Sequence, residues 1–328
     1  YTGWYTLSLH DALPIWFYTL HVLATALTLG ENASIKKDKS VPAFKNVIVN
    51  GIVLAEDGKK MSKRLKNYPE PDLILEKYGA DAMRYYLLTS PVMEAENLNF
   101  SETGVREVYN KLVNTLWNVV EFYKMYAGEE VKEVESNNVL DQWILAKLQI
   151  LIGDVTKGME TYRLVDANRP IVEFVTELSQ WYVRRSRDRF KGEDMEDRKV
   201  AIATLRHVLV ELSKVMAPFT PFIAEKIWLD LSGKKTSVHL EDWPKASGAK
   251  IDQKIISDMT MARKIVELGL AARAEAGIKV KQPLQQVHYQ TVERISSDLE
   301  KIIAEELNVK EVIHAVNIKA RENMIVKD

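Results

Sequence analysis

The chain has 328 residues, of which 46% are hydrophobic and 28% charged, with a formal net charge of −1 and a sequence pI of about 6.7. This composition predicts a soluble globular protein of two or three domains and excludes a globally basic nucleic-acid binder, so any RNA contact requires local clusters of Lys and Arg. The absence of cysteine excludes disulfides and thiolate zinc sites, and it fits a reducing, cytoplasmic compartment.

The N-terminal stretch has two parts. Residues 1–15 are assigned to no domain, because Gly3–Leu7 repeats the pattern of Trp16–Leu20 and so indicates a junction. Ile15–Leu29 is apolar but contains His21, falls short of the ~20 residues that span a bilayer, and follows no cationic region. We therefore expect a buried helix and no membrane partner.

A strand followed by a basic loop is predicted next. Phe44–Leu54 clusters β-branched residues, which predicts a buried strand of a parallel sheet. The loop Asp57–Asn67 holds five basic side chains beside Gly58, which lets the backbone turn where a Cβ would clash. Lys60 and Lys63 are three residues apart and can converge on a polyanion. The loop is either a phosphate-handling loop or a solvated basic patch, and the second is the commoner meaning of such a run.

After the loop, prolines and short polar side chains predict two helices. Asp72 and Asp81 are expected to be their N-caps. The helices are expected over Leu73–Tyr78 and Ala82–Thr89, with Gly79 between them.

From Gly104 to Leu231 the apolar residues recur at helical spacing, which predicts a helical bundle. The stripes are Val105, Val108, Leu112, Leu116, Val119 and Tyr123; Leu140, Ile144, Leu148, Leu151 and Val155; Ile171, Phe174, Leu178, Trp181 and Tyr182; and Leu205, Val208, Leu212 and Val215. Pro218 and Pro221 break the chain before a last short helix at Ala224–Leu231.

The third helix of this bundle carries an arginine-rich passage, Trp181–Phe190. Its four arginines are Arg184, Arg185, Arg187 and Arg189. They can complement the helix macrodipole and pair with Glu193, Asp194 and Glu196. Beside aromatic side chains, guanidinium groups also bind RNA phosphates and stack on unpaired bases. Both interpretations stay open for any single arginine, and RNA contact is the one favoured for the group. Arg84, by contrast, is expected to form a structural ion pair.

The remaining residues predict a small α+β unit. Asp252–Ala276 is predicted to be one long helix closed by Gly277, and residues 278–284 a strand that exits at a proline. Two further strands and one helix are expected, at Val287–Gln290, Val309–Ile318 and Val292–Leu307 respectively.

Several passages resemble one family closely. Lys60–Arg64 is KMSKR, preceded by VNGIVLAEDGK and followed by LKNYPEPDLILEKYGADAMRYYLLTSP, which resembles the signature-loop region of class I aminoacyl-tRNA synthetases. The Trp181–Phe190 passage and the phrases GIKVKQPL and EELNVKEV resemble isoleucyl-tRNA synthetases of the kind found in archaea, eukaryotes and some bacteria. The resemblance runs from about Trp16 to the last residue.

The resemblance implies a mainly α fold in three parts. Residues 16–96 would be the C-terminal remnant of a Rossmann-type catalytic domain, and residues 97–236 an α-helical anticodon-binding domain. Residues 237–328 would be a small α+β region, expected to be cut because relatives of this type continue further.

The resemblance also implies a reaction and its residues. Isoleucine attacks the α-phosphorus of ATP, pyrophosphate leaves, and the isoleucyl group moves to the tRNA 3′ end. Lys63 and Lys60 are the expected catalytic residues, and Trp16 is expected to line the isoleucine pocket. The expected ATP-binding residues are Lys60, Met61, Ser62, Lys63 and Arg64. The expected tRNA-binding residues are Trp181, Arg184, Arg185, Arg187 and Arg189. The expected partners of this cytoplasmic monomer are tRNA(Ile), L-isoleucine and ATP with Mg²⁺, with no metal site in the chain.

Half of the family's machinery is missing from the sequence. No His-Ile-Gly-His-type motif occurs, and the inserted editing domain is absent, so the chain alone is expected to be inactive and unable to edit. A valyl-tRNA synthetase and a non-catalytic tRNA-binding module remain as alternatives, and the coding sequence upstream of Trp16 would decide between an enzyme and such a module.

Overall fold

A computed structural model of the chain describes residues 17–28, 44–128, 136–248 and 251–315, which form parts of two compact units, Tyr1–Val49 and Asn50–Asp328. In the first unit, residues 17–28 form a helix whose side chains are mostly exposed. Among the described residues, Phe44 packs on this helix, with its ring centre 5.2 Å from those of Phe17 and His21. The prediction of a buried helix is therefore wrong for this unit. Residues 1–15 and Trp16 lie outside the described residues.

The strand predicted at Phe44–Leu54 is mostly absent. Residues 45–50 are irregular and exposed, and only β1 (Val53–Leu54) forms a strand, parallel to β2 (Leu98–Asn99). A strand needs a neighbour for its N–H and C=O groups, and in the described part of the chain β1 has only the two residues of β2 and an isolated antiparallel bridge from Leu54 to Lys60.

Helix α2 (Pro71–Leu88) follows the loop and bends at Gly79, whose φ is 80°. The N-cap position is Glu70, and no side chain caps the helix there, so Asp72 is not the cap that the sequence predicted. Asp81 caps a different helix, α9 (Pro221–Leu231), because its carboxylate accepts hydrogen bonds from the N–H groups of Phe222 at 3.2 Å and Ile223 at 2.7 Å. The predicted cap thus stabilises an element far along the chain.

Two more contacts fasten α2 to the bundle. Arg84 donates to the carbonyls of Phe219 at 3.3 Å and Pro218 at 3.1 Å, and the Tyr85 hydroxyl donates to the carbonyl of Asn168. The ion pair predicted for Arg84 is wrong: the side chain has a structural role, but it donates to carbonyls and not to a carboxylate. Carbonyls just past the end of α8 (Met195–Met216) attract a cation because the negative end of a helix dipole lies there.

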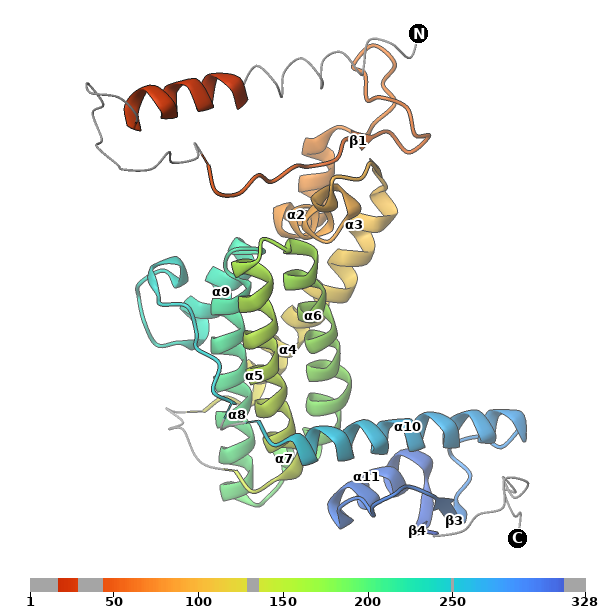
Figure 1. Ribbon diagram of the computed structural model, residues 1–328. Coiled ribbons are helices and arrows are strands. Elements are labelled where there is room, and N and C mark those ends of the chain that lie inside the picture. Colours follow the sequence, from red (N-terminus) through yellow and green to blue (C-terminus); the bar gives the residue numbers. More distant parts are fainter. Residues whose placement is uncertain (1–16, 29–43, 129–135, 249–250, 316–328) are drawn as a thin grey trace. The chain divides into compact units, whose positions relative to one another are not determined.

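The helical bundle is built as the apolar stripes predicted (Figure 1). Its segments are α3 (Glu102–Val108), η2 (Tyr109–Asn114), α4 (Thr115–Tyr126), α5 (Val139–Glu160), α6 (Leu164–Glu177), η3 (Leu178–Val183), α7 (Arg184–Lys191), α8 (Met195–Met216) and α9. Segments η2 and η3 are π-helical turns that join α3 to α4 and α6 to α7 without a break. Every described stripe residue is buried except Val108 and Trp181, which are half-buried.

The C-terminal region is the predicted α+β unit. A 3-10 turn, η4 (Val238–Leu240), precedes α10 (Gln253–Glu275), which begins at the Asp252 cap; β3 (Leu284–Tyr289), α11 (Ser297–Leu307) and β4 (Val309–His314) follow. Strands β3 and β4 are parallel, with Leu284 opposite Val309. Figure 1 shows α11 and the two strands beneath α10, and Met259 and Leu299 join them to the core of the bundle.

Residues 278–283 form a turn instead of the predicted strand, and the strand starts only after Pro283. The carbonyls of Lys279 and Gln282, which a ladder would need, are taken by the Arg273 guanidinium. The predicted helix at Val292–Leu307 likewise starts later, at Ser297. Among the described helices, none has the length and apolarity to cross a lipid bilayer.

Candidate functional site

The basic loop folds back on β1. The N–H of Ala55 donates to the Lys59 carbonyl at 2.8 Å, and Gly58 has a φ of 78°, as expected for a turn that excludes a Cβ. Asp57 accepts from the Lys59 N–H at 3.1 Å and lies 3.1 Å from the Lys59 ammonium. The N–H bond first, and then the ammonium, hold the pKa of Asp57 below its usual value.

The second half of the loop is fixed by Asn67. Its side-chain oxygen accepts from the Ser62 N–H at 2.9 Å, and its amide donates to the Lys60 carbonyl at 3.1 Å. The Ser62 carbonyl accepts from the Lys66 N–H at 2.9 Å. Met61 packs against the small core cluster of α2 and α3, so the packing role predicted for it is confirmed.

The ends of the loop's cationic side chains reach solvent. Lys60, Lys63 and Arg64 are all exposed. Within the described residues, the side chains of Lys63 and Arg64 form no ion pair or hydrogen bond. The loop therefore presents cations on a backbone that its own hydrogen bonds already hold in shape, which suits a polyanionic ligand.

Arg189 is the most enclosed of the four arginines. Its guanidinium donates to both oxygens of Asp141, at 2.8 and 2.9 Å, and to Asp197 at 2.7 Å. Asp141 is fully buried and also accepts from the Tyr182 hydroxyl at 2.8 Å. Burial alone lowers the pKa of Arg189, but its hydrogen bonds to Asp141 and Asp197 outweigh burial and raise it. This network joins α5, α7 and α8.

Arg184 and Arg185 face α11. Arg184 lies 2.7 Å and Arg185 3.1 Å from the same oxygen of Glu306, and Arg185 also pairs with Glu305. The partners predicted from the neighbouring sequence are wrong. One of them, Asp194, accepts from two N–H groups and caps α8.

Trp181 is half-buried between two guanidinium groups. Arg184 lies 5.9 Å and Arg263, from α10, 5.2 Å from the ring centre. Arg263 is itself paired with Glu177. The indole therefore serves the contact between the bundle and α10 in this structure.

Arg187 is the remaining arginine of the passage and is exposed. Lys191, four residues later on α7, is exposed too, and neither side chain has a partner within the described residues. Sequence analysis missed Lys191, although an (i, i+4) pair on a helix that begins at Arg184 lies on one face. Arg187 and Lys191 are therefore the exposed cations of α7 that have no acidic partner among the described residues.

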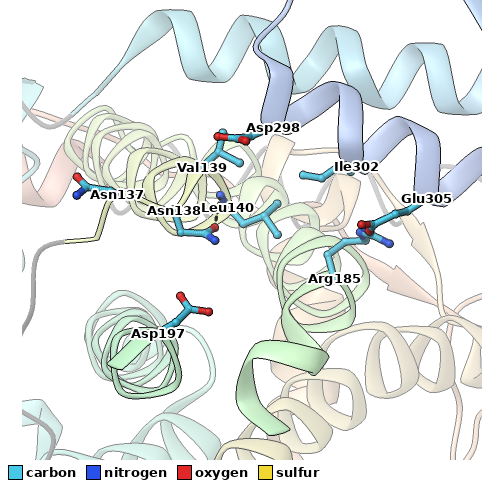
Figure 2. Close-up of a pocket in the computed structure, with 9 residues that line it drawn as sticks. All are labelled: Asn137, Asn138, Val139, Leu140, Arg185, Asp197, Asp298, Ile302 and Glu305. Carbon is cyan, nitrogen blue, oxygen red and sulfur yellow. Dashed lines mark hydrogen bonds and ion pairs between the residues drawn. The ribbon is translucent and has the colours of Figure 1, made fainter. Parts of the chain in front are cut away.

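A pocket of about 450 Å³ lies where α5, α7, α8 and α11 meet (Figure 2). It is lined by Asn137, Asn138, Val139, Leu140, Arg185, Asp197, Asp298, Ile302 and Glu305. Three carboxylates against one guanidinium make it unfavourable for phosphate. No group of three His, Asp or Glu side chains in the described part of the chain could hold a metal ion.

Two family models match the chain. The model described as the anticodon-binding domain of tRNA ligase matches residues 141–289, which cover most of the bundle, α10 and β3. The model described as tRNA synthetases class I (I, L, M and V) matches residues 6–99, which contain the basic loop.

The chain is also similar to curated isoleucine–tRNA ligases. It is 46% identical to that of Chlamydia trachomatis serovar D, over 90% of this chain and 29% of the relative. It is 45% identical to that of Chlamydia muridarum over the same shares, and 40% identical to that of Protochlamydia amoebophila over 95% of this chain and 31% of the relative. The chain thus spans about three tenths of the length of these relatives. They are bacterial, and they give no support to the archaeal and eukaryotic type. Residues 6–99 are thus similar to class I tRNA synthetases, and residues 141–289 to an anticodon-binding domain of tRNA ligases.

Proposed function

We propose that this chain works as part of an isoleucine–tRNA ligase, which joins L-isoleucine to tRNA(Ile) and converts ATP to AMP and pyrophosphate. The observation that carries the proposal is the loop that holds Lys63 and Arg64 in solvent, unneutralised within the described residues, inside a segment similar to such ligases. Residues 16–96 would supply the phosphate loop, residues 97–236 the anticodon-binding bundle, and residues 237–328 its C-terminal support, in a cytoplasmic monomer.

In the first step, a carboxylate oxygen of isoleucine forms a bond to the α-phosphorus while the bond from that phosphorus to the bridging oxygen of pyrophosphate breaks. Negative charge grows on the leaving group, so an ammonium that reaches it there stabilises the transition state more than the substrate. Lys63 has this role, Lys60 assists, and Arg64 binds phosphate oxygens. Met61 and Ser62 hold the loop in place, and Trp16 lines the isoleucine pocket. Mg²⁺ accompanies ATP and neutralises phosphate charge.

For tRNA, the ion pairs divide the predicted residues into two groups. Arg187, together with Lys191, is free to bind phosphate, and Arg184, whose side chain is 46% exposed, can join them. Trp181, Arg185 and Arg189 would act by holding the helix that carries these cations. The free pair at the end of α7 then gives α7 an electrostatic contact with the RNA backbone.

A titration of the full chain with labelled tRNA tests the proposal. Binding should be tightest for a tRNA(Ile) transcript and weaker, by at least several-fold, for the same transcript with a changed anticodon. Tighter binding of tRNA(Val) would favour a valyl-tRNA synthetase. Equal binding of every transcript would favour an RNA-binding module without a synthetase's specificity.

A further inference from the structure

The turn between α10 and β3, residues 278–283, is held by a buried arginine. Arg273 is 2% exposed, and its guanidinium donates to four carbonyls. These are the carbonyls of Leu307 at 2.9 Å, Lys279 at 3.2 Å, Gln282 at 2.8 Å and Asn308 at 3.2 Å. Burying a cation is unfavourable unless hydrogen bonds satisfy it. Here the carbonyls of the turn satisfy the guanidinium, and the guanidinium in turn fixes the backbone of the turn.

A second side chain, that of Asn308, also holds the turn. Asn308, in the left-handed region with a φ of 49°, donates its amide to the Val280 carbonyl at 2.9 Å. The N–H of Gln282 donates to the Lys279 carbonyl at 3.0 Å, and Ile278 is buried beneath. Three carbonyls of the turn, those of Lys279, Val280 and Gln282, are thus occupied by donors from the protein.

The exposed side of the turn is positive. Lys279 and Lys281 are exposed, and within the described residues neither side chain has an ion pair or hydrogen bond. The N–H groups of Lys279, Val280 and Lys281 likewise meet no backbone acceptor in the part of the chain that the structure describes. Two exposed ammonium groups on one short turn, above the charge of the buried Arg273 guanidinium that holds the turn, attract anions.

We propose that residues 279–282 form a second RNA-binding surface of this chain, one that contacts tRNA phosphates. The proposal rests on the proposed function. RNA is the favoured polyanion because the anticodon-binding match extends to residue 289 and so includes the turn. The turn differs from the Trp181–Phe190 passage because acidic residues of the chain neutralise most of that passage and leave the two lysines of the turn unpaired.

The test removes the two lysines from the full chain. A Lys279→Gln/Lys281→Gln variant is titrated with labelled tRNA(Ile) over a salt series. The plot of log affinity against log salt should lose about one to two units of slope, since each lost phosphate contact removes about 0.7–0.9. The control is Lys264→Gln/Lys301→Gln, which removes the same charge from lysines that pair with Glu267 and Asp298 at 3.0 Å, and it should keep the parent slope.

A slope equal to that of the parent, or equal losses in both variants, would overturn the proposal. If the parent bound no tRNA at all, the proposed function itself would fail. If the lysine variant lost binding only to phosphatidylserine vesicles, the surface would be one for lipid and not for RNA.

A further variant tests the shape of the turn. Asn308→Gly keeps the left-handed backbone but removes the bond to Val280. With both lysines intact, it should weaken tRNA binding several-fold at constant salt, because the turn must then be ordered on binding. Binding like that of the parent would show that the held shape has no part in recognition.

Discussion

The loop Asp57–Asn67 and the passage Trp181–Phe190 share a high content of basic residues but differ in their electrostatics. Both are rich in Lys and Arg, and both are predicted to bind phosphate. In the loop, Lys63 and Arg64 are exposed and unpaired within the described residues, whereas three of the four arginines of the passage are held by carboxylates. The sequence therefore identifies where the cationic side chains are, but acidic residues elsewhere in the chain determine which of them are free to bind an anionic ligand.

Removing the most enclosed arginine should have the largest effect. Arg189→Met leaves Asp141 buried without its cation, which should lower the free energy of unfolding by about 3–5 kcal/mol. Urea denaturation measures this. Arg187→Met, the matched control on the same helix, should stay within about 0.5 kcal/mol of the parent. Similar losses of stability in the two variants would contradict the assignment of Arg189 to the fold and of Arg187 to the free surface.

The next effect concerns catalysis by the loop. In a Chlamydia trachomatis ligase whose matching segment is replaced by this chain, Lys63→Ala should slow isoleucine-dependent ATP–pyrophosphate exchange by about 10²–10³. Lys59→Ala should change it little, because that ammonium faces Asp57. An unchanged turnover number for Lys63→Ala would remove this lysine from the transition state.

A smaller effect should appear when the passage is made to resemble the loop. Glu306→Gln removes the carboxylate that Arg184 and Arg185 share, which should free Arg184 for RNA and make the salt dependence of tRNA binding steeper by up to about one unit. Glu196→Gln, which removes an exposed acid paired with Lys199, is the control. If the slope stays constant, Arg184 serves only to hold α11.

The smallest expected effect is a pH dependence of the folding stability that arises from Asp81. Burial raises the pKa of this carboxyl, and the N–H groups of Ile223 and Phe222 oppose the shift. The folded chain therefore holds the proton more tightly than the unfolded chain. The stability that protonation adds is complete below the ordinary Asp pKa near 4 and is lost as the pH rises through the higher folded value.

The comparison needed is between the parent and Asp81→Asn. The free energy of unfolding of the parent, relative to this variant, should fall as the pH rises from about 3.5 to 7. Urea titrations at several pH values measure the difference. A difference that rises with pH would mean that the hydrogen bonds to α9 outweigh burial.

Local features of the fold were predictable from the sequence. The stripes of the bundle, the extent of the helix at Asp252–Ala276, and the turns at Gly58 and Gly277 depend on residues close together in the chain. The prediction of a strand over the whole of Phe44–Leu54 was wrong, because a strand forms only beside a partner strand and no local pattern shows whether that partner is present.

Contacts between residues far apart in the sequence could not be predicted either. Asp81 and Ile223 are 142 residues apart, and Arg184 and Glu306 are 122 apart. Nothing in the spacing of these residues indicates that they meet. The same limit explains why the sequence predicted RNA contact for all four arginines, whereas Lys191 could have been found from its local (i, i+4) spacing to Arg187.

The π-helical turn η3 sets the angular phase of the whole arginine passage. Phe174, Leu178, Tyr182, Ser186 and Phe190 are all buried and lie four residues apart. At ~100° per residue, a regular α-helix would rotate Phe190 about 160° away from Phe174. The extra residue that the π turn accommodates cancels about 100° of that rotation and returns Phe190 to the core. Deleting one residue within Leu178–Val183 would therefore swing Arg189 off Asp141, so a single insertion fixes the direction of every cation that follows it.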